Sequence, residues 1–310
     1  MVTKSKGMLA GVSIIAMVAC SGDGGADRSD DSEKAVALRE LGALTLILGG
    51  PRLGPESESH TLYFSSYPVG GPSSDCDAGA ANAEEGTRTR RLNFLAGSGN
   101  DASYTRYTFE DCALANPAGL QNGQVEVGHI GEYDPLDPNS TFQLYAEYGG
   151  NSGPFVLTTT REEVAGSPVA IEEQISGVVE QKGDDGRTEV GSRLSRTTTR
   201  SDGYWLEWRQ GADDGFFFQA RSGSSVDVSG SYSYRSSTCS GGARRVHTTV
   251  ALVTDVGRGP IGGSITISSE SGDIEFTFSD DGSGMAMLED GSVVNFSSQE
   301  AANAFESFGC

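Results

Sequence analysis

Alternation of apolar and polar residues with a period of two runs through the chain from Thr61 onward, and it constrains the fold more than any other feature. In residues 225–235, one parity holds Val226, Val228, Tyr232 and Tyr234, and the other holds serines and charged residues. Such alternation predicts strands with one buried and one exposed face. The other segments of this kind are Leu62–Tyr67, Arg88–Leu95, Tyr104–Glu110, Val125–His129, Thr141–Tyr148, Phe155–Thr160, Val169–Glu180, Glu189–Thr199, Tyr204–Arg209, Gly215–Arg221, Val246–Leu252, Ile265–Ile267 and Ile274–Phe278.

Asp-Gly pairs punctuate the second half of the chain. They are Asp185-Gly186, Asp202-Gly203, Asp214-Gly215, Asp281-Gly282 and Asp290-Gly291. Asp-Gly suits the tight turns of hairpins, because glycine accepts a positive φ. The spacing leaves no room for the helical crossovers that parallel strands need. We therefore predict a mainly β fold, an antiparallel meander forming a large curved sheet or an open barrel, with short helices at its N- and C-terminal ends.

The two helices are predicted from capping signals. Ser32 precedes a leucine-rich segment, Glu33 to about Leu48, which Gly49-Gly50-Pro51 ends. Burial of this helix against the sheet is the preferred interpretation, and the alternatives are a helix on a membrane or a partner, or a strand over its last five residues. Near the C-terminus, Ser297 and Glu300 have the spacing of a capping box.

The N-terminus has the features of an export signal. Lys4 and Lys6 precede thirteen uncharged residues, Gly7–Ala19, which are too few to span a membrane and match the apolar core of a signal peptide. The run ends in Met17-Val18-Ala19-Cys20, followed by the glycine-rich segment Ser21–Gly25. This arrangement resembles the signal of bacterial lipoproteins, although Met17 stands where leucine is usual. The resemblance covers the first 32 residues or so, and it names no family for the rest.

The resemblance implies that Cys20 becomes the first residue of the mature chain and carries acyl chains. Two or more chains give stable membrane attachment, whereas one gives only marginal attachment. Ser21 implies sorting to the outer membrane. We therefore expect a signal peptide over 1–19, a flexible tether over 20–32 and a β-rich domain over 33–310. The alternative is two β subdomains, 33–150 and 151–310.

Cysteines provide a second prediction about the compartment. Four remain after Cys20, namely Cys76, Cys112, Cys239 and Cys310. Export places them in an oxidising space, where an even number predicts two disulfides. Three pairings are open. We prefer Cys76–Cys112 with Cys239–Cys310, because each pair then lies within one half of the chain.

The net charge and the absence of known catalytic motifs limit the functions that the sequence predicts. The net charge is −21, and it becomes −23 once Lys4 and Lys6 leave with the signal peptide. So acidic a chain is not expected to bind nucleic acid. No serine-hydrolase, zinc-protease or P-loop motif occurs in the sequence. We therefore predict no catalytic residue, no metal ligand and no cofactor.

Aromatic residues beside the Asp213-Asp214-Gly215 turn are the binding residues we predict, namely Tyr204, Trp205 and Trp208, with Phe216–Phe218 across the turn. Burial in the core is the simpler interpretation of these rings. Basic residues form two groups, one of Arg88, Arg90 and Arg91 and one of Arg187, Arg193, Arg196 and Arg200. Arg196 and Arg200 share one parity and could contact an anionic ligand, but ion pairing with the many acids is the preferred interpretation.

The function expected first is that of a lipid-anchored, non-enzymatic structural or binding module of the outer membrane. Its partner would be an envelope protein, glycan or lipid. The alternatives are a periplasmic carrier of an apolar ligand and a hydrolase that acts on glycans. An apolar hollow would favour the carrier. Two carboxyl groups facing each other in a cleft would favour the hydrolase.

Overall fold

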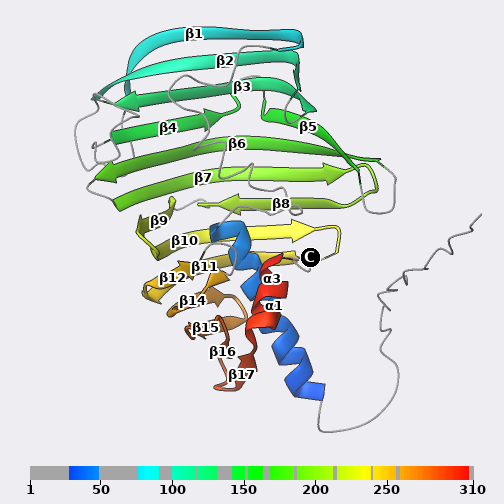
Figure 1. Cartoon of the computed structure of the whole chain (residues 1–310), viewed down its shortest axis with the longest axis vertical. Coiled ribbons are helices and arrows are strands. Elements are labelled where there is room, and N and C mark those ends of the chain that lie inside the picture. The colour runs from blue at the N-terminus through cyan, green and yellow to red at the C-terminus, as the bar shows by residue number, and fades with distance from the viewer. Residues whose placement is uncertain are drawn as a thin grey trace, which may run out of the picture.

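The computed structural model describes residues 28–48, 76–90, 100–115, 118–130, 142–150, 153–162, 168–184, 187–211, 215–238, 240–255 and 259–306 (Figure 1). It confirms the mainly β, antiparallel fold class, with one helix near each end of the described chain. Four predicted features, the signal peptide, Cys20, Cys239 with Cys310, and the strand over 62–67, lie outside the described residues. No helix in the described part of the chain has the length and apolarity to cross a bilayer.

The elements follow one another in a simple order. The helices are α1, Arg28–Leu48, and α3, Ser298–Glu306. The strands are β1 Ala78–Arg90, β2 Asn100–Ala115, β3 Ala118–Ile130, β4 Phe142–Tyr148, β5 Phe155–Glu162, β6 Pro168–Asp184, β7 Arg187–Arg200, β8 Trp205–Gln210, β9 Phe217–Ser222, β10 Ser225–Ser236, β11 Ser240–Val250, β12 Leu252–Asp255, β13 Gly259–Pro260, β14 Gly263–Ser269, β15 Gly272–Phe278, β16 Gly284–Met287 and β17 Val293–Phe296.

The sheet is an open meander. Each strand pairs antiparallel with strands that are close to it in sequence, so the rows run from β1 at one end to β17 at the other (Figure 1). Among the described strands, β1 pairs only with β2 and β17 only with β16. Most links are hairpins, as the Asp-Gly pairs predict. Gly203, Gly282 and Gly291 have φ of 95°, 82° and 84° in the turns after β7, β15 and β16.

Two rows of the sheet are each built from two collinear strands. Both β4 and β5 lie between β3 and β6, and both β8 and β9 lie between β7 and β10. The prediction of a hairpin turn at Asp214-Gly215 is therefore wrong, because this pair lies in the break between β8 and β9. Gly211 permits the break. Its φ is +66°, and a Cβ there would lie 2.5 Å from the Ser192 carbonyl oxygen.

The alternative division of the domain after residue 150 falls in the break between β4 and β5. Gly149 and Gly153 flank this break with φ of 81° and 121°. On both sides of the break, the strands pair with the same neighbours, β3 and β6. The hydrogen-bonded sheet therefore continues across this position.

One face of the sheet, which we call the covered face, carries the core. Under α1 and α3, the core includes Leu206, Trp208, Tyr232, Tyr234, Val246, Ile265, Phe276 and Phe296. The same face of β2–β6 holds a second buried cluster around Tyr107, Phe109, Val125, Tyr148 and Phe155. The opposite side, which we call the open face, carries the serines, threonines and most of the charged residues of the alternation.

Helix α1 begins at Arg28 rather than at the predicted Glu33, so residues 28–32 belong to the helix and not to the tether. Acidic residues at 30 and 31 favour an earlier start, because they stabilise the first turn of a helix. Ala37, Leu41 and Ala43 of α1 are buried in the core. The predicted burial against the sheet is confirmed for these residues (Figure 1).

A buried ion pair fixes α1 on the covered face. The Glu40 carboxylate is 2% exposed, and it accepts hydrogen bonds from Arg244 Nε at 3.1 Å and Nη2 at 2.9 Å. The Tyr234 hydroxyl donates to the same carboxylate at 3.3 Å. Burial, and then the charge of Glu40, raise the pKa of Tyr234 to about 12. The negative charge of Glu40 beneath the helix is therefore paired with the positive charge of Arg244 on the sheet.

The predicted Cys76–Cys112 disulfide is confirmed. The two Cα atoms are 5.2 Å apart, in the ordinary range for a disulfide. Cys112 is fully buried on the covered face of β2. The bond ties the segment that precedes β1 to the neighbouring strand.

The C-terminal capping box is also confirmed, and it supports a prediction about pH. Ser297 N–H donates to Glu300 Oε2 at 2.8 Å, and Lys34 Nζ of α1 lies 2.6 Å from Glu300 Oε1. The Lys34 contact and the Ser297 donors lower the pKa of Glu300 to about 2.

The lowered pKa of Glu300 makes the folded state more stable at pH values above about 4.5, the ordinary pKa of a glutamate. This contribution disappears as the pH falls towards 2. We expect Ser297→Ala to lower the free energy of unfolding by about 1 kcal/mol at pH 7.

Urea unfolding at pH 7 measures the cost of Ser297→Ala, and urea unfolding between pH 2 and 7 tests the role of the Glu300 carboxylate. The difference in stability between the native protein and Glu300→Gln should shrink as the pH falls from 4.5 towards 2. A difference that stays constant over this range would contradict the assignment of the effect to the Glu300 carboxylate.

Candidate functional site on the open face

Cross-strand register places two carboxylates on either side of a small residue on the open face. Ala220 of β9 is the register partner of Glu189 in β7 and of Asp227 in β10. Adjacent strands are about 4.8 Å apart, so the two acidic residues are about 10 Å apart along the row. The methyl group of Ala220 leaves the space between them open.

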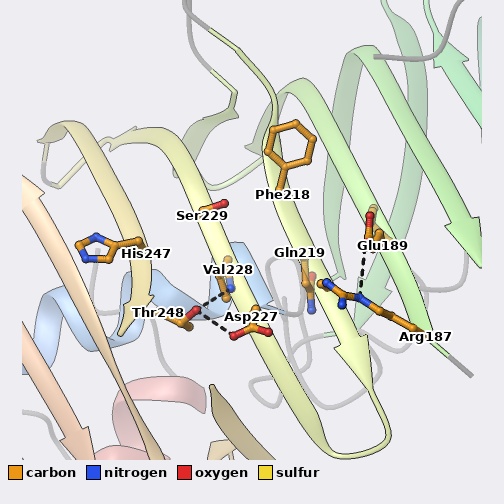
Figure 2. A pocket seen from close by; sticks show the side chains of 11 residues that line it. Arg187, Glu189, Phe218, Gln219, Asp227, Val228, Ser229, His247 and Thr248 are labelled. Carbon is orange, nitrogen blue, oxygen red and sulfur yellow. Dashed lines mark hydrogen bonds and ion pairs between the residues drawn. The ribbon is translucent and has the colours of Figure 1, made fainter. Parts of the chain in front are cut away.

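The next set of register-paired residues along the same strands adds an aromatic ring and further polar groups to the site. Phe218 of β9 pairs with Gly191 on one side and Ser229 on the other, and Ser229 pairs with His247 of β11. The Phe218 side chain is 39% exposed. Together these two rows line a hollow of about 320 Å³. Figure 2 shows Arg187 and Glu189 on one side of the hollow and His247 on the other.

Charges around the hollow are balanced. Glu189 lies 3.1 Å from Arg187 Nε and 2.6 Å from Lys182 Nζ. Asp227 accepts a hydrogen bond from the Thr248 hydroxyl at 3.2 Å. Arg187 and Lys182 thus offset the charge of Glu189, while Asp227 is hydrogen-bonded to Thr248. The hollow offers both hydrogen-bond donors and acceptors.

A line of aromatic rings continues from the hollow along the row of β8 and β9. We call Trp205, Phe216 and Phe218 the aromatic strip. Trp205 is 36% exposed, and the Arg235 guanidinium lies 5.9 Å from its ring centroid. Phe216 lies 6.2 Å from Phe218, and the Arg193 guanidinium lies 5.7 Å from its ring centroid. These rings leave part of their apolar surface accessible beside charged groups.

The length of the aromatic strip follows from the register. Trp205 pairs with Thr199 of β7, and Phe218 pairs with Gly191 of the same strand. Eight residues of a strand separate these positions, which corresponds to about 26 Å. The strip is therefore longer than the hollow and could contact a ligand at both ends.

A carboxylate lies between the two ends of the strip. Arg235 Nε donates to Glu207 Oε2 at 2.6 Å, and Arg209 Nε donates to Oε1 at 3.0 Å. Partial burial opposes ionisation of this group, yet the hydrogen bonds and charges of both arginines lower the pKa of Glu207 below its ordinary value. Glu207 is thus an ionised and paired group.

The structure separates the three predicted binding residues. Trp205 lies on the open face, Tyr204 is half-buried with the Arg200 guanidinium 5.7 Å from its ring centroid, and Trp208 lies in the core. Sequence reasoning missed Ala220, Asp227 and His247 as lining residues. The only sequence signal for these residues is the alternation. It predicts on which face of the sheet a side chain lies, but not which residues of neighbouring strands are aligned with one another.

Most arginines of the two predicted groups form ion pairs, namely Arg88, Arg90, Arg187, Arg196 and Arg200. Arg91 lies outside the described residues. On the open face, Arg88 and Arg106 both bind the buried Glu126, and Arg90 Nη1 lies 2.8 Å from Glu147 Oε2. Burial raises the pKa of Tyr145, whose hydroxyl donates to Glu126, to about 12.

Arg196, of the second arginine group, is 3% exposed on the covered face and pairs with Glu173. It is therefore not available on the surface to an anionic ligand. Within the described residues, no three His, Cys, Asp or Glu side chains form a set that could hold a metal ion.

No protein-family model, curated protein or solved structure matches this chain.

Proposed function

We propose that the protein is a lipid-anchored, non-enzymatic binding module of the outer membrane that binds its ligand on the open face. The observation that carries the binding role is the hollow between Glu189, Asp227 and Phe218, with the aromatic strip beside it. Exposed rings grouped with polar side chains are typical of binding surfaces. From β8 to β17, in contrast, the covered face is packed beneath α1 and α3.

The anchor is proposed from the N-terminal sequence. Cys20 precedes the first residue of α1 by eight positions. A fully extended chain of this length spans at most about 28 Å. A lipid on Cys20 would therefore keep α1 and the end of the sheet near β17 close to the bilayer.

Substitution of Cys20 tests the anchor. We expect the native protein and the control Ser21→Ala to incorporate labelled palmitate and to sediment with envelopes. The Cys20→Ser variant should lose the label and appear in the soluble fraction. If the Cys20→Ser variant still incorporates labelled palmitate and sediments with envelopes, lipidation at this residue is refuted.

One observation favours a second candidate, a hydrolase that acts on glycans. Glu189 and Asp227 flank the open space over Ala220, and paired carboxylates about 5–10 Å apart carry out glycoside hydrolysis. In this case, release of reducing ends from a glycan should fall at least a hundredfold in both Glu189→Gln and Asp227→Asn. The carrier alternative is less well supported, because charged groups line the hollow.

A further inference from the structure

We propose that the open face binds an extended, uncharged glycan chain along the aromatic strip, with the hollow as one subsite and Trp205 as a second. The inference rests on the proposed binding role of the open face and adds the class of ligand. It concerns the contacts along the whole row of β8 and β9, which the hollow alone does not explain.

The placement of the aromatic rings suits a chain-like ligand. Trp205 and Phe218 both project from the open face of one row, although one has an odd number and the other an even number. The break between β8 and β9 shifts the alternation, because Phe217 enters the core while Phe218 stays exposed. Rings about 26 Å apart on one row suit a chain-like ligand with repeated apolar surfaces. The C–H faces of sugar rings supply such surfaces.

The paired charges on the open face favour an uncharged ligand. An anionic ligand in the hollow would meet Asp227 and Glu189, and a cationic ligand would meet Arg187. Lys182, on the neighbouring strand β6, is paired with Glu189. Near the Trp205 end of the strip, Glu207 is already paired with Arg209 and Arg235. An uncharged ligand avoids the loss of these pairs, which a charged ligand would have to displace.

The hydrogen-bonding groups in the hollow suit the hydroxyl groups of a sugar. Asp227 has carboxylate oxygens that accept, while the exposed Ser229 and His247 can both donate and accept. Hydroxyl groups of a sugar need partners of both kinds. Together with Phe218, these side chains provide one apolar contact and several polar contacts at one subsite.

Calorimetry with oligosaccharides of defined length tests the proposal. The probes are β-linked glucose oligomers and N-acetylglucosamine oligomers of one to seven units, with galacturonate oligomers as the anionic series. We expect the affinity for at least one uncharged series to rise with length until the chain spans the strip. The anionic series should bind at least tenfold more weakly.

Two substitutions separate the subsites. Phe218→Ala should weaken the binding of oligomers of every length by about fivefold to tenfold, whereas Trp205→Ala should weaken only that of the longer ones. Trp205→Phe should restore most of the affinity, because it keeps a ring. Val293→Ala, which alters an exposed residue of the open face on β17, is the matched control and should bind as the native protein does. Circular dichroism confirms that each variant is folded.

Three outcomes would overturn the proposal. In the first, the folded native protein binds neither uncharged series. In the second, Phe218→Ala leaves the affinity unchanged, and in the third, the anionic oligomers bind as tightly as the uncharged ones. None of these outcomes alters the fractionation of Cys20→Ser, so failure of the glycan inference is distinguishable from failure of the lipid anchor.

Discussion

Replacement of Glu40 by alanine is expected to lower the free energy of unfolding by about 3–5 kcal/mol. The Glu40 carboxylate is buried beneath α1 and accepts two hydrogen bonds from Arg244 and one from Tyr234. Its removal leaves a guanidinium charge without its partner at the helix–sheet contact. Urea unfolding followed by circular dichroism at pH 7 measures the loss.

Two further variants make this result specific. Lys34→Ala breaks the partly exposed pair with Glu300 and should cost less than about 1 kcal/mol. The double variant Glu40→Met with Arg244→Met removes both charges and should be more stable than Glu40→Ala. A cost below 1 kcal/mol for Glu40→Ala would show that the buried pair does not hold α1 on the sheet.

Removal of the Cys76–Cys112 disulfide should cost about 3–4 kcal/mol. The bond joins residues 36 positions apart, and cross-linking a loop of this length reduces the conformational entropy of the unfolded chain. Cys76→Ala with Cys112→Ala avoids a new polar group at the buried Cys112 position. Thermal or urea unfolding of the double variant gives the cost.

The single variant Cys76→Ala is the control for the disulfide. It already breaks the bond, so its stability should match that of the double variant. If the double variant unfolds within 1 kcal/mol of the native protein, the segment before β1 is held by other contacts.

Much of the fold could be predicted because its signals are local. The alternation in residues 225–235 and 265–278 reports one buried face, and Asp-Gly marks the turns after β15 and β16. The sequence pattern predicts no strand over the first ten residues of β1. The segment 78–87 is rich in alanine and glycine, which have weak strand propensity, and it is a strand because it pairs with β2.

The candidate site was only partly predictable because it depends on register. Trp205 and the rings at 216–218 are visible in the sequence, but Ala220 between Glu189 and Asp227 is a property of three aligned strands. The break at Gly211–Gly215 adds a further difficulty. It interrupts the alternation, so counting residues from β8 assigns those of β9 to the wrong face.

The position of α1 has a consequence for the order of folding. Ribosomes make the helix early, yet its binding surface belongs to strands made late, and Glu40 and Arg244 are 204 positions apart. Neighbouring hairpins form through contacts between nearby residues, which is a fast process compared with long-range closure. The meander can thus grow one hairpin at a time, while the docking of the first helix completes the molecule only after its last strands have been synthesised.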